Sequence, residues 1–136
     1  MTIVLDANAG IEIVLDREKA AILSPLIEKS TKVITSQLYK AETTNVISKY
    51  VKGGFLDKEQ ALEKLNLCEA LIDEFTDISN YKDEVLLESI RLNHSACDLI
   101  YLVLARRHGA RLITLDKKLR ELCIKCGIET VDEKQF

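Results

Sequence analysis

The chain has 136 residues and a mass of 15.4 kDa, which predicts one domain spanning residues 1–136. A composition of 47% hydrophobic and 30% charged residues, with five Gly and one Pro, excludes a disordered or low-complexity chain. No apolar run approaches a membrane span and no secretion signal opens the chain, so we expect a cytoplasmic protein. The net charge of −3 gives no overall attraction to nucleic acid.

Helix and strand patterns alternate along the chain. Strands are expected at residues 2–5, 32–35, 112–115 and 128–131, and helices at 9–28, 36–51, from 57 onward, 81–92, 95–108 and 117–126. Because strands separated by helices pair in parallel through right-handed crossovers, the pattern predicts a three-layer α/β/α sandwich with a central parallel sheet.

Local signals mark several of these boundaries. Pro25 is predicted to break or restart the first helix, and Ser36, Asp57 and Ser95 are expected to cap the helices that follow them. Gly109 is expected to end the helix before it. The helix after Asp57 is predicted to carry an apolar stripe of Ala61, Leu65, Cys68, Ile72 and Phe75.

The four cysteines give a weak signal for metal or redox chemistry. Only Cys123 and Cys126 are closely spaced, and they lie late in a predicted helix, where the helix dipole disfavours a thiolate. We therefore expect buried or idle thiols in a reducing compartment, rather than a zinc site.

Charge is unevenly distributed. Basic residues dominate between Arg106 and Lys125, and acidic residues dominate between Asp57 and Glu88. If the basic residues share a face, that face would meet a phosphate-bearing ligand. The alternative is that both regions are solvated helix faces with a chance asymmetry.

Two acids follow buried strands. Asp6 comes directly after residues 2–5, and Asp116 directly after residues 112–115. Because the carboxyl ends of parallel strands meet at one edge of the sheet, both acids are expected at the crevice where open α/β sheets bind ligands. Taken alone, Asp6 is equally explained as the end of a strand or the cap of the next helix.

Two more acids lie on helix faces that are predicted to be buried. Glu42 is one turn from both Leu38 and Val46, and Asn45 shares the edge of that face. Asp98 stands in the first turn of its helix, directly before the apolar run of residues 99–105. Because an unpaired buried carboxylate is costly, Asp98 needs a partner, a proton or a cation.

Four short motifs together resemble those of the PIN-domain nucleases, and are most similar to the VapC-type toxin ribonucleases. They are V-L-D-A-N at Asp6, A-E-T-T-N-V at Glu42, S-A-C-D-L-I-Y-L-V-L-A at Asp98, and L-I-T-L-D-K-K-L at Asp116. The resemblance spans residues 6–131 in the order of the family. One departure is Lys118, at a position where some relatives carry a further Asp or Asn.

The resemblance implies an endoribonuclease in which a metal ion activates water to cleave a phosphodiester bond. Four carboxylates without His or Cys form an oxygen-only donor set, which suits Mg²⁺ or Mn²⁺. Asp6 and Asp98 are expected to be direct ligands, Asp116 a direct or water-mediated ligand, and Glu42 a ligand or the group that orients the water. Thr114 and Asn45 are expected to support these acids by hydrogen bonds.

The resemblance also implies an RNA substrate, a cognate antitoxin as protein partner, and a homodimer. Lys117, Lys118 and Arg120 lie next to Asp116 and are expected to contact the RNA backbone. With only three Phe and four Tyr, we expect no broad surface for base stacking.

Two other classes of protein remain open at the level of sequence. A phosphoryl-transfer domain of the receiver or dehalogenase type also places Asp after its first strand, but Asn8 stands where the dehalogenase pattern has a second Asp. The other alternative is a PIN-like protein that binds or processes RNA without being a toxin.

Overall fold

The computed structural model describes residues 1–136, apart from the side chain of Glu133. Its centre is a four-stranded parallel sheet in the order β3-β2-β1-β4, formed by β1 (Thr2–Leu5), β2 (Lys32–Ser36), β3 (Glu74–Thr76) and β4 (Arg111–Ile113). Ile3 of β1 pairs with Val33 on one side and with Arg111 on the other. β1 is therefore an interior strand, in agreement with its uninterrupted apolar sequence.

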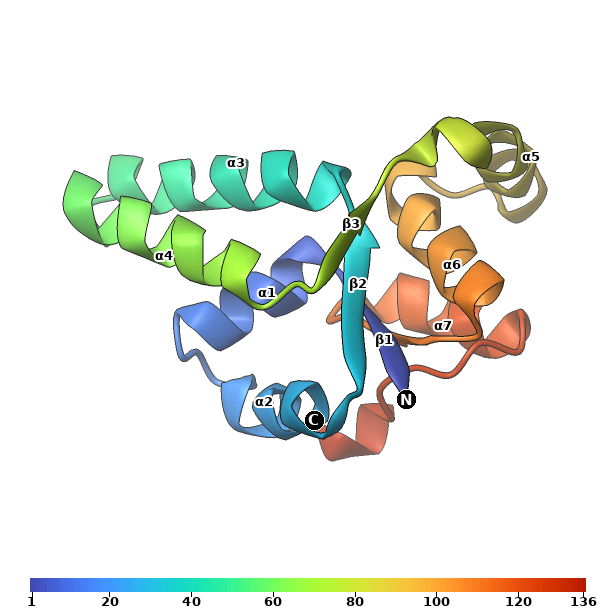
Figure 1. The fold of residues 1–136 in the computed structure, drawn as a ribbon, viewed down its shortest axis with the longest axis horizontal. Coiled ribbons are helices and arrows are strands. Elements are labelled where there is room, and N and C mark those ends of the chain that lie inside the picture. The colour runs from blue at the N-terminus through green and yellow to red at the C-terminus, as the bar shows by residue number, and fades with distance from the viewer.

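Helices cover both faces of the sheet, which confirms the predicted three-layer α/β/α architecture (Figure 1). One layer contains α1 (Ala7–Val14), α2 (Ala20–Lys29), α3 (Leu38–Lys52) and α4 (Lys58–Ala70). The other contains α5 (Lys82–Leu92), α6 (Ala96–His108) and α7 (Lys117–Lys125). Two short 3₁₀ helices complete the chain, at Ile78–Asn80 and Glu133–Gln135. No described helix is both long enough and apolar enough to cross a bilayer.

Each face of the sheet has its own hydrophobic core. Ile3 and Leu5 pack into the core beneath α1 to α4, whereas Val4 packs into the core beneath α5 to α7. This is the alternation that a pleated strand imposes. The apolar run from Leu99 to Ala105 is buried throughout, because α6 lies between the sheet and both α5 and α7.

The first predicted helix is two helices, and the prediction that Pro25 interrupts it is wrong. Pro25 lies inside α2, and the helical structure is interrupted earlier, between residues 15 and 19. Asp16 adopts a left-handed conformation there, with φ of 50°. A carboxylate oxygen of Glu12 accepts the Lys19 backbone N–H at 2.9 Å, so a side chain of α1 stabilises the break.

Two other boundaries differ from the prediction. Phe75 lies in the edge strand β3, and the helix predicted to contain it ends at Ala70. A strand of three residues is too short to show a period of its own. At the other end of the chain, the strand predicted over 128–131 is reduced to a single pairing of Leu112 with Thr130.

The capping predictions gave mixed results. Asp57 forms a capping box with Gln60 at the start of α4, and Gly109 ends α6 with φ of 56°. Ser36 instead ends β2 and accepts the Leu38 N–H at 3.1 Å, so that Gln37 is the residue that precedes α3. Ser95 precedes α6 without a side-chain capping bond.

The cysteines are all free thiols. Cys68 and Cys123 are buried, and burial raises the pKa of Cys68 to about 11 and that of Cys123 to about 12. Both thiols are therefore held in the protonated form, which is a poor nucleophile and a poor metal ligand.

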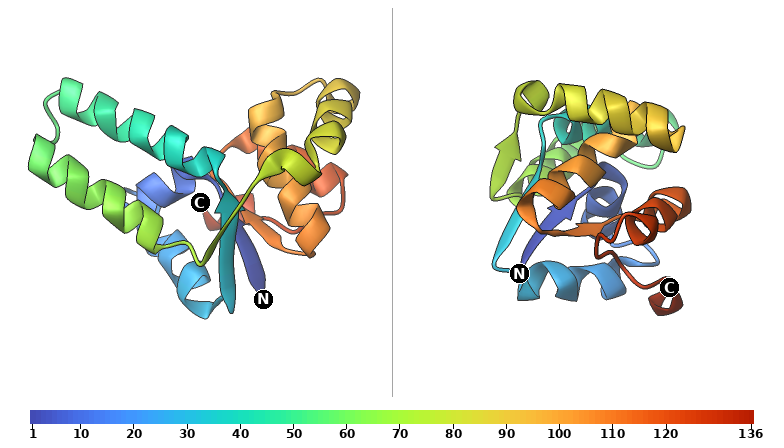
Figure 2. Two further views of the ribbon diagram at one scale, coloured as in Figure 1. Left: turned by 45° about the horizontal axis from the view of Figure 1, so that its top comes forward. Right: turned by 90° about the vertical axis from the view of Figure 1, so that its right-hand side faces the viewer.

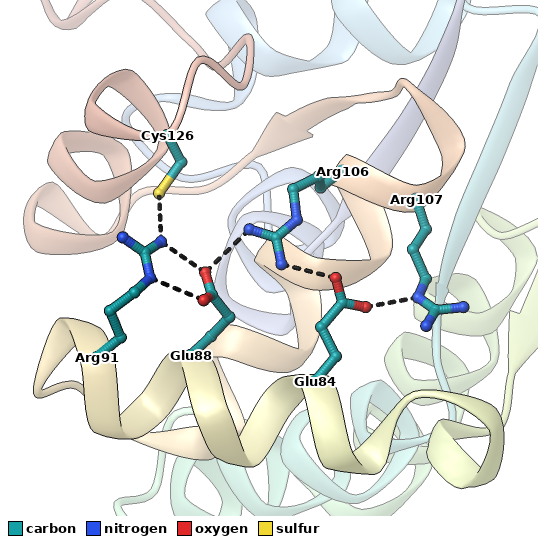
Figure 3. Close-up of polar contacts among 6 residues, drawn as sticks. All are labelled: Glu84, Glu88, Arg91, Arg106, Arg107 and Cys126. Atoms are coloured by element: carbon teal, nitrogen blue, oxygen red, sulfur yellow. Dashed lines mark hydrogen bonds and ion pairs between the residues drawn. The ribbon is translucent and has the colours of Figure 1, made fainter.

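Two of the basic residues between Arg106 and Lys125 form ion pairs with acids of α5. Arg106 donates to Glu84 at 2.7 Å and to Glu88 at 2.9 Å, and Arg107 donates to Glu84 at 2.6 Å (Figure 3). Arg91 makes a two-pronged contact with Glu88 at 2.7 and 2.8 Å. Glu84 and Glu88, from the predicted acidic region, thus pair with two of the basic residues and attach α5 to α6.

Replacing Glu88 with Gln is expected to lower the free energy of unfolding by about 1–3 kcal/mol at neutral pH, because two arginines lose their buried counter-charge. The arginines lower the pKa of Glu88 to about 2, so its carboxylate stabilises the fold above its ordinary pKa of 4.5. That contribution is lost as the pH falls through about 2. Urea denaturation at several pH values measures the difference.

The matched control is Glu63→Gln on the exposed face of α4, with an expected change within about 0.5 kcal/mol. A gap between wild type and Glu88→Gln that stays constant as the pH falls below 4.5 would contradict this account of Glu88.

Candidate active site

The carboxyl-terminal edge of the sheet is where the predicted acids converge. Asp6 directly follows the interior strand β1, and Asp116 lies shortly after its neighbour β4. Glu42 lies in α3, the helix that follows β2 on the other side of β1. Asp98 lies in the first turn of α6, which packs against β1 and β2.

Asp6 is the most deeply placed of these acids, with 6% of its surface exposed. Its Oδ1 accepts the Ala9 N–H at 2.9 Å and its Oδ2 accepts a hydrogen bond from the Thr114 hydroxyl. Burial raises the pKa of Asp6 to about 7 despite these bonds, and the nearby charges of Glu42 and Asp98 raise it further. Asp6 therefore does cap α1, but it does so in a buried position close to two other acids.

Thr114 connects Asp6 to Asp116. It is fully buried just beyond β4, and its hydroxyl oxygen also accepts the Asp116 N–H at 3.1 Å. The Asp116 carboxylate caps α7 by accepting the Leu119 N–H at 3.1 Å. One threonine side chain thus fixes the backbone at Asp116 and the carboxylate of Asp6 relative to each other.

Glu42 is half-buried and faces the sheet side of α3, where it contacts α6. The hydroxyl of the buried Tyr101 donates a hydrogen bond to Glu42 Oε1, with 2.5 Å between the two oxygens. Burial raises the pKa of Glu42 and the charge of Asp98 raises it further, although the Tyr101 hydrogen bond works in the opposite direction. Glu42 is therefore an oriented acid for which the negative charge is costly.

Asp98 pairs with a histidine one turn earlier in the chain. His94 Nε2 lies 2.9 Å from Asp98 Oδ2, with the side chains 15% and 34% exposed respectively. This contact restrains one oxygen of Asp98. The apolar run that follows Asp98 is packed in the core, so the carboxylate lies where α6 emerges from the interior.

The donor chemistry of this cluster fits a hard divalent cation. All four acids offer oxygen, and the negative charges of Asp6 and Glu42 are disfavoured by burial and by neighbouring acids. Among the described residues, however, no three His, Cys, Asp or Glu side chains lie close enough together to hold a metal ion. Each acid contacts a protein donor instead, so a cation would require some of these side chains to turn toward each other.

The other predicted site residues are placed unequally. Asn45 is exposed on α3, and no hydrogen bond of its side chain is found among the described residues. Lys117 and Lys118 are exposed in the first turn of α7, beside Asp116. Arg120 is buried: it donates to the Thr114 carbonyl at 3.4 Å and lies 5.0 Å from the centre of the Phe136 ring. Arg120 thus lies on the buried face of α7, and its contact with RNA stays a prediction.

Sequence reasoning named Thr114 as a support for the acids but missed two other partners, His94 and Tyr101. His94 precedes Asp98 by four residues, a spacing that brings side chains together on a helix, but His94 lies just before α6 begins. Tyr101 shares the face of Asp98, yet its contact with Glu42 spans 59 positions of the chain. The first partner had a local signal, and the second had none.

A cavity of about 350 Å³ opens next to Asp116. Its lining comes from α1, the turn after α1, α3 and the segment after β4: Asn8, Ile11, Glu12, Arg17, Val46, Tyr50, Leu115 and Asp116. Of the four acids, Asp116 therefore lines a cavity that opens to solvent.

Comparison with known proteins identifies the family of the chain. The family model described as PIN domain matches residues 3–125. Ribonuclease VapC3 of Pyrobaculum aerophilum is 27% identical over 126 residues, covering 89% of this chain and 94% of that protein. The chain is thus similar over almost its whole length to a protein named as a ribonuclease.

Solved structures show the same fold. The crystal structure of PAE2754 from Pyrobaculum aerophilum superimposes with a TM-score of 0.74 at 22% identity, covering 99% of this chain and 96% of that one. VapBC2 from Rickettsia felis, solved with a DNA fragment from its promoter, gives 0.68 at 20% identity and covers 96% and 98%. This chain belongs to the PIN-domain family, with VapC-type proteins among its relatives.

Proposed function

We propose that this protein is a Mg²⁺- or Mn²⁺-dependent endoribonuclease that acts as the toxin of a toxin-antitoxin pair. The observation that carries the proposal is the buried Asp6, whose pKa is raised to about 7 beside Glu42 and Asp98. A fold gains nothing from burying acids together at a sheet edge, and such groups are typical of functional sites. The similarity to a protein named Ribonuclease VapC3 supports RNA as the substrate.

Asp6, Asp98, Asp116 and Glu42 are the residues that would hold the cation. When bound, the cation would polarise the scissile phosphate and make a water molecule more acidic. The Thr114 hydroxyl holds the Asp6 carboxyl group in place by donating a hydrogen bond to its Oδ2. The Tyr101 hydroxyl donates a hydrogen bond to Oε1 of Glu42. The other oxygen of Glu42, Oε2, would then bind the cation or orient the attacking water. Lys117 and Lys118 stand beside Asp116 to contact the RNA backbone.

The proposed partners are an antitoxin and a second copy of this chain. The solved VapBC2 complex of Rickettsia felis supports an antitoxin. The outer face of α5 supports a homodimer, since Leu86, Leu87 and Ile90 are 58%, 64% and 69% exposed there. We place the activity in the cytoplasm, where RNA is present and free thiols stay reduced.

A PIN-like RNA-binding protein without catalysis is the alternative, and Asp98→Asn separates the two. The variant is expected to lose RNA cleavage by at least about a hundredfold, because a neutral amide is a poor ligand for a hard cation. Its fold should be kept, because His94 can still bond to an amide at position 98. Cleavage of labelled single-stranded RNA in Mn²⁺, with circular dichroism of the variant, measures both.

Asp83→Asn is the matched control, since Asp83 is also in the first turn of a helix and its side chain is 90% exposed. It should cleave like wild type. An Asp98→Asn protein that is folded and fully active would reject the assignment of the site, and a wild type that binds but never cleaves RNA would favour the alternative function.

A further inference from the structure

A second cavity continues the one beside Asp116. It measures about 600 Å³ and is lined by Leu15, Arg17, Lys49, Tyr50, Phe55 and Leu56. Arg17 and Tyr50 line both cavities, so the two cavities adjoin there and form a groove that leads away from Asp116. Its lining residues come from α1, from the connection between α1 and α2, from α3, from the turn that joins α3 to α4 and from the segment after β4. Figure 2 shows how the α3–α4 hairpin projects away from the sheet.

An exposed aromatic ring stands at the outer end of this groove. Phe55 is 76% exposed, and its ring also contacts neighbouring residues. Its ring meets the Tyr50 ring edge-on at 5.9 Å between centroids, and its backbone N–H bonds to the Tyr50 carbonyl at 2.9 Å. A Cβ added at Gly53 would lie 3.0 Å from the Phe55 ring, so the absence of a side chain at Gly53 gives the ring its place. Phe55 therefore presents a fixed, solvent-facing apolar surface.

Cationic side chains accompany the two aromatic rings. The Arg17 guanidinium lies 5.8 Å from the centre of the Tyr50 ring and 3.5 Å from Glu12, and its side chain is 53% exposed. Lys49 is exposed on the same wall. Proteins bind single-stranded nucleic acids with aromatic rings and cationic side chains in alternation. The bases stack on the flat apolar rings, and the phosphates contact the positive charges.

We propose that this groove, from Asp116 past Arg17 and Tyr50 to Phe55, binds the single-stranded RNA that flanks the cleaved bond. A base stacks on Phe55, and Arg17 and Lys49 contact the backbone phosphates. The inference rests on the proposed ribonuclease function and adds a substrate subsite to it. RNA is favoured over a protein segment because Asp116, one of the acids of the proposed cleavage site, lines one end of the groove, and the cationic Arg17 and Lys49 line the other cavity. The proposed stacking surface consists of the Phe55 ring, which agrees with the low aromatic content of the chain.

The test measures RNA binding in the full-length Asp98→Asn protein, in which cleavage is blocked. Fluorescence anisotropy with a labelled single-stranded oligouridine reports the affinity. Adding Phe55→Ala is expected to weaken binding about five- to tenfold, in line with the loss of one stacked base. Phe55→Trp should retain binding, and Arg17→Gln should reduce the dependence on salt. In the active protein, Phe55→Ala should raise KM and leave kcat unchanged, because it removes binding rather than chemistry.

Leu62→Ala is the matched control, since Leu62 is 66% exposed on α4 outside the groove. It should change nothing. If Phe55→Ala binds RNA as tightly as Leu62→Ala, the subsite is rejected, the groove is left to a protein segment, and the ribonuclease proposal stands. If the Asp98→Asn protein binds no RNA and wild type cleaves none, both the subsite and the proposed function are rejected.

Discussion

Asp6→Asn is expected to abolish RNA cleavage and, in the same molecule, to stabilise the metal-free protein at about pH 8. Asn keeps the cap of α1, because its amide oxygen can accept the Ala9 N–H that Asp6 now accepts. The Thr114 hydroxyl can reverse its role and accept from the Asn side chain. What the substitution removes is a buried negative charge, which the folded state disfavours and which the proposed cation requires.

The pKa of Asp6 sets the size and the pH range of this stabilisation. Folding raises that pKa from 3.8 to about 7, so the protonated form is the one that the folded state favours. The stability associated with Asp6 is full below about pH 3.8 and is lost as the pH rises through about 7. Above that pH the buried charge costs up to about 4 kcal/mol, the free energy equivalent of the shift.

Thermal or urea unfolding with chelator present measures this effect. The advantage of Asp6→Asn over wild type should be largest at about pH 8 and should shrink toward zero at about pH 4. Asp57→Asn is the matched control, because Asp57 also caps a helix but is exposed. It should show no gain that grows with pH. If Asp6→Asn has a lower free energy of unfolding than wild type at pH 8, the negative charge of Asp6 does not destabilise the folded state.

Mn²⁺ is expected to raise the melting temperature of the wild-type protein, because a ligand that binds only the folded state stabilises it. At a concentration of about 100 times Kd the gain is about 2.7 kcal/mol. The gain should be smaller at about pH 6 than at about pH 8, since Asp6, with a pKa of about 7, is largely protonated at the lower pH and must release that proton to bind.

Differential scanning fluorimetry with and without Mn²⁺ at the two pH values measures the shift, and excess chelator should reverse it and also stop cleavage. Asp6→Asn should show little or no shift. The same shift in Asp6→Asn as in wild type would mean that the cation binds elsewhere, and would count against the four-acid cluster as the metal site.

Local patterns predicted the elements that position the site. An apolar strand followed by an acid predicted β1 with Asp6 at its end, and an uninterrupted apolar run predicted the burial of α6 behind Asp98. Such patterns are readable because burial on two faces requires apolar residues at consecutive positions. The break before α2 and the short strand β3 were not predicted, because their signals lie in single contacts rather than in a period.

The fate of the arginines shows the limit of reasoning from charge. Charge distribution left open whether the last third of the chain forms a basic face or carries a chance asymmetry on solvated helices. In the structure Arg106 and Arg107 pair with acids of α5 (Figure 3), and Arg120 lies buried against Phe136. Whether a cation meets solvent or an internal carboxylate depends on which helices pack together, and helix packing is not encoded in a local excess of charge.

By itself the sequence determined that this chain forms a parallel α/β sandwich and that acids stand at the carboxyl ends of β1 and β4, because these properties follow from neighbouring residues. The sequence also named Thr114 as a support for the acids, but only the tertiary structure decided which atoms each acid contacts. The Thr114 hydroxyl reaches Asp6 across 108 positions and Tyr101 reaches Glu42 across 59. The groove from Asp116 to Phe55 likewise combines the connection after α1 with the end of α3. Contacts between such distant segments arise from the packing of helices on the sheet, which brings together residues that share no pattern along the chain.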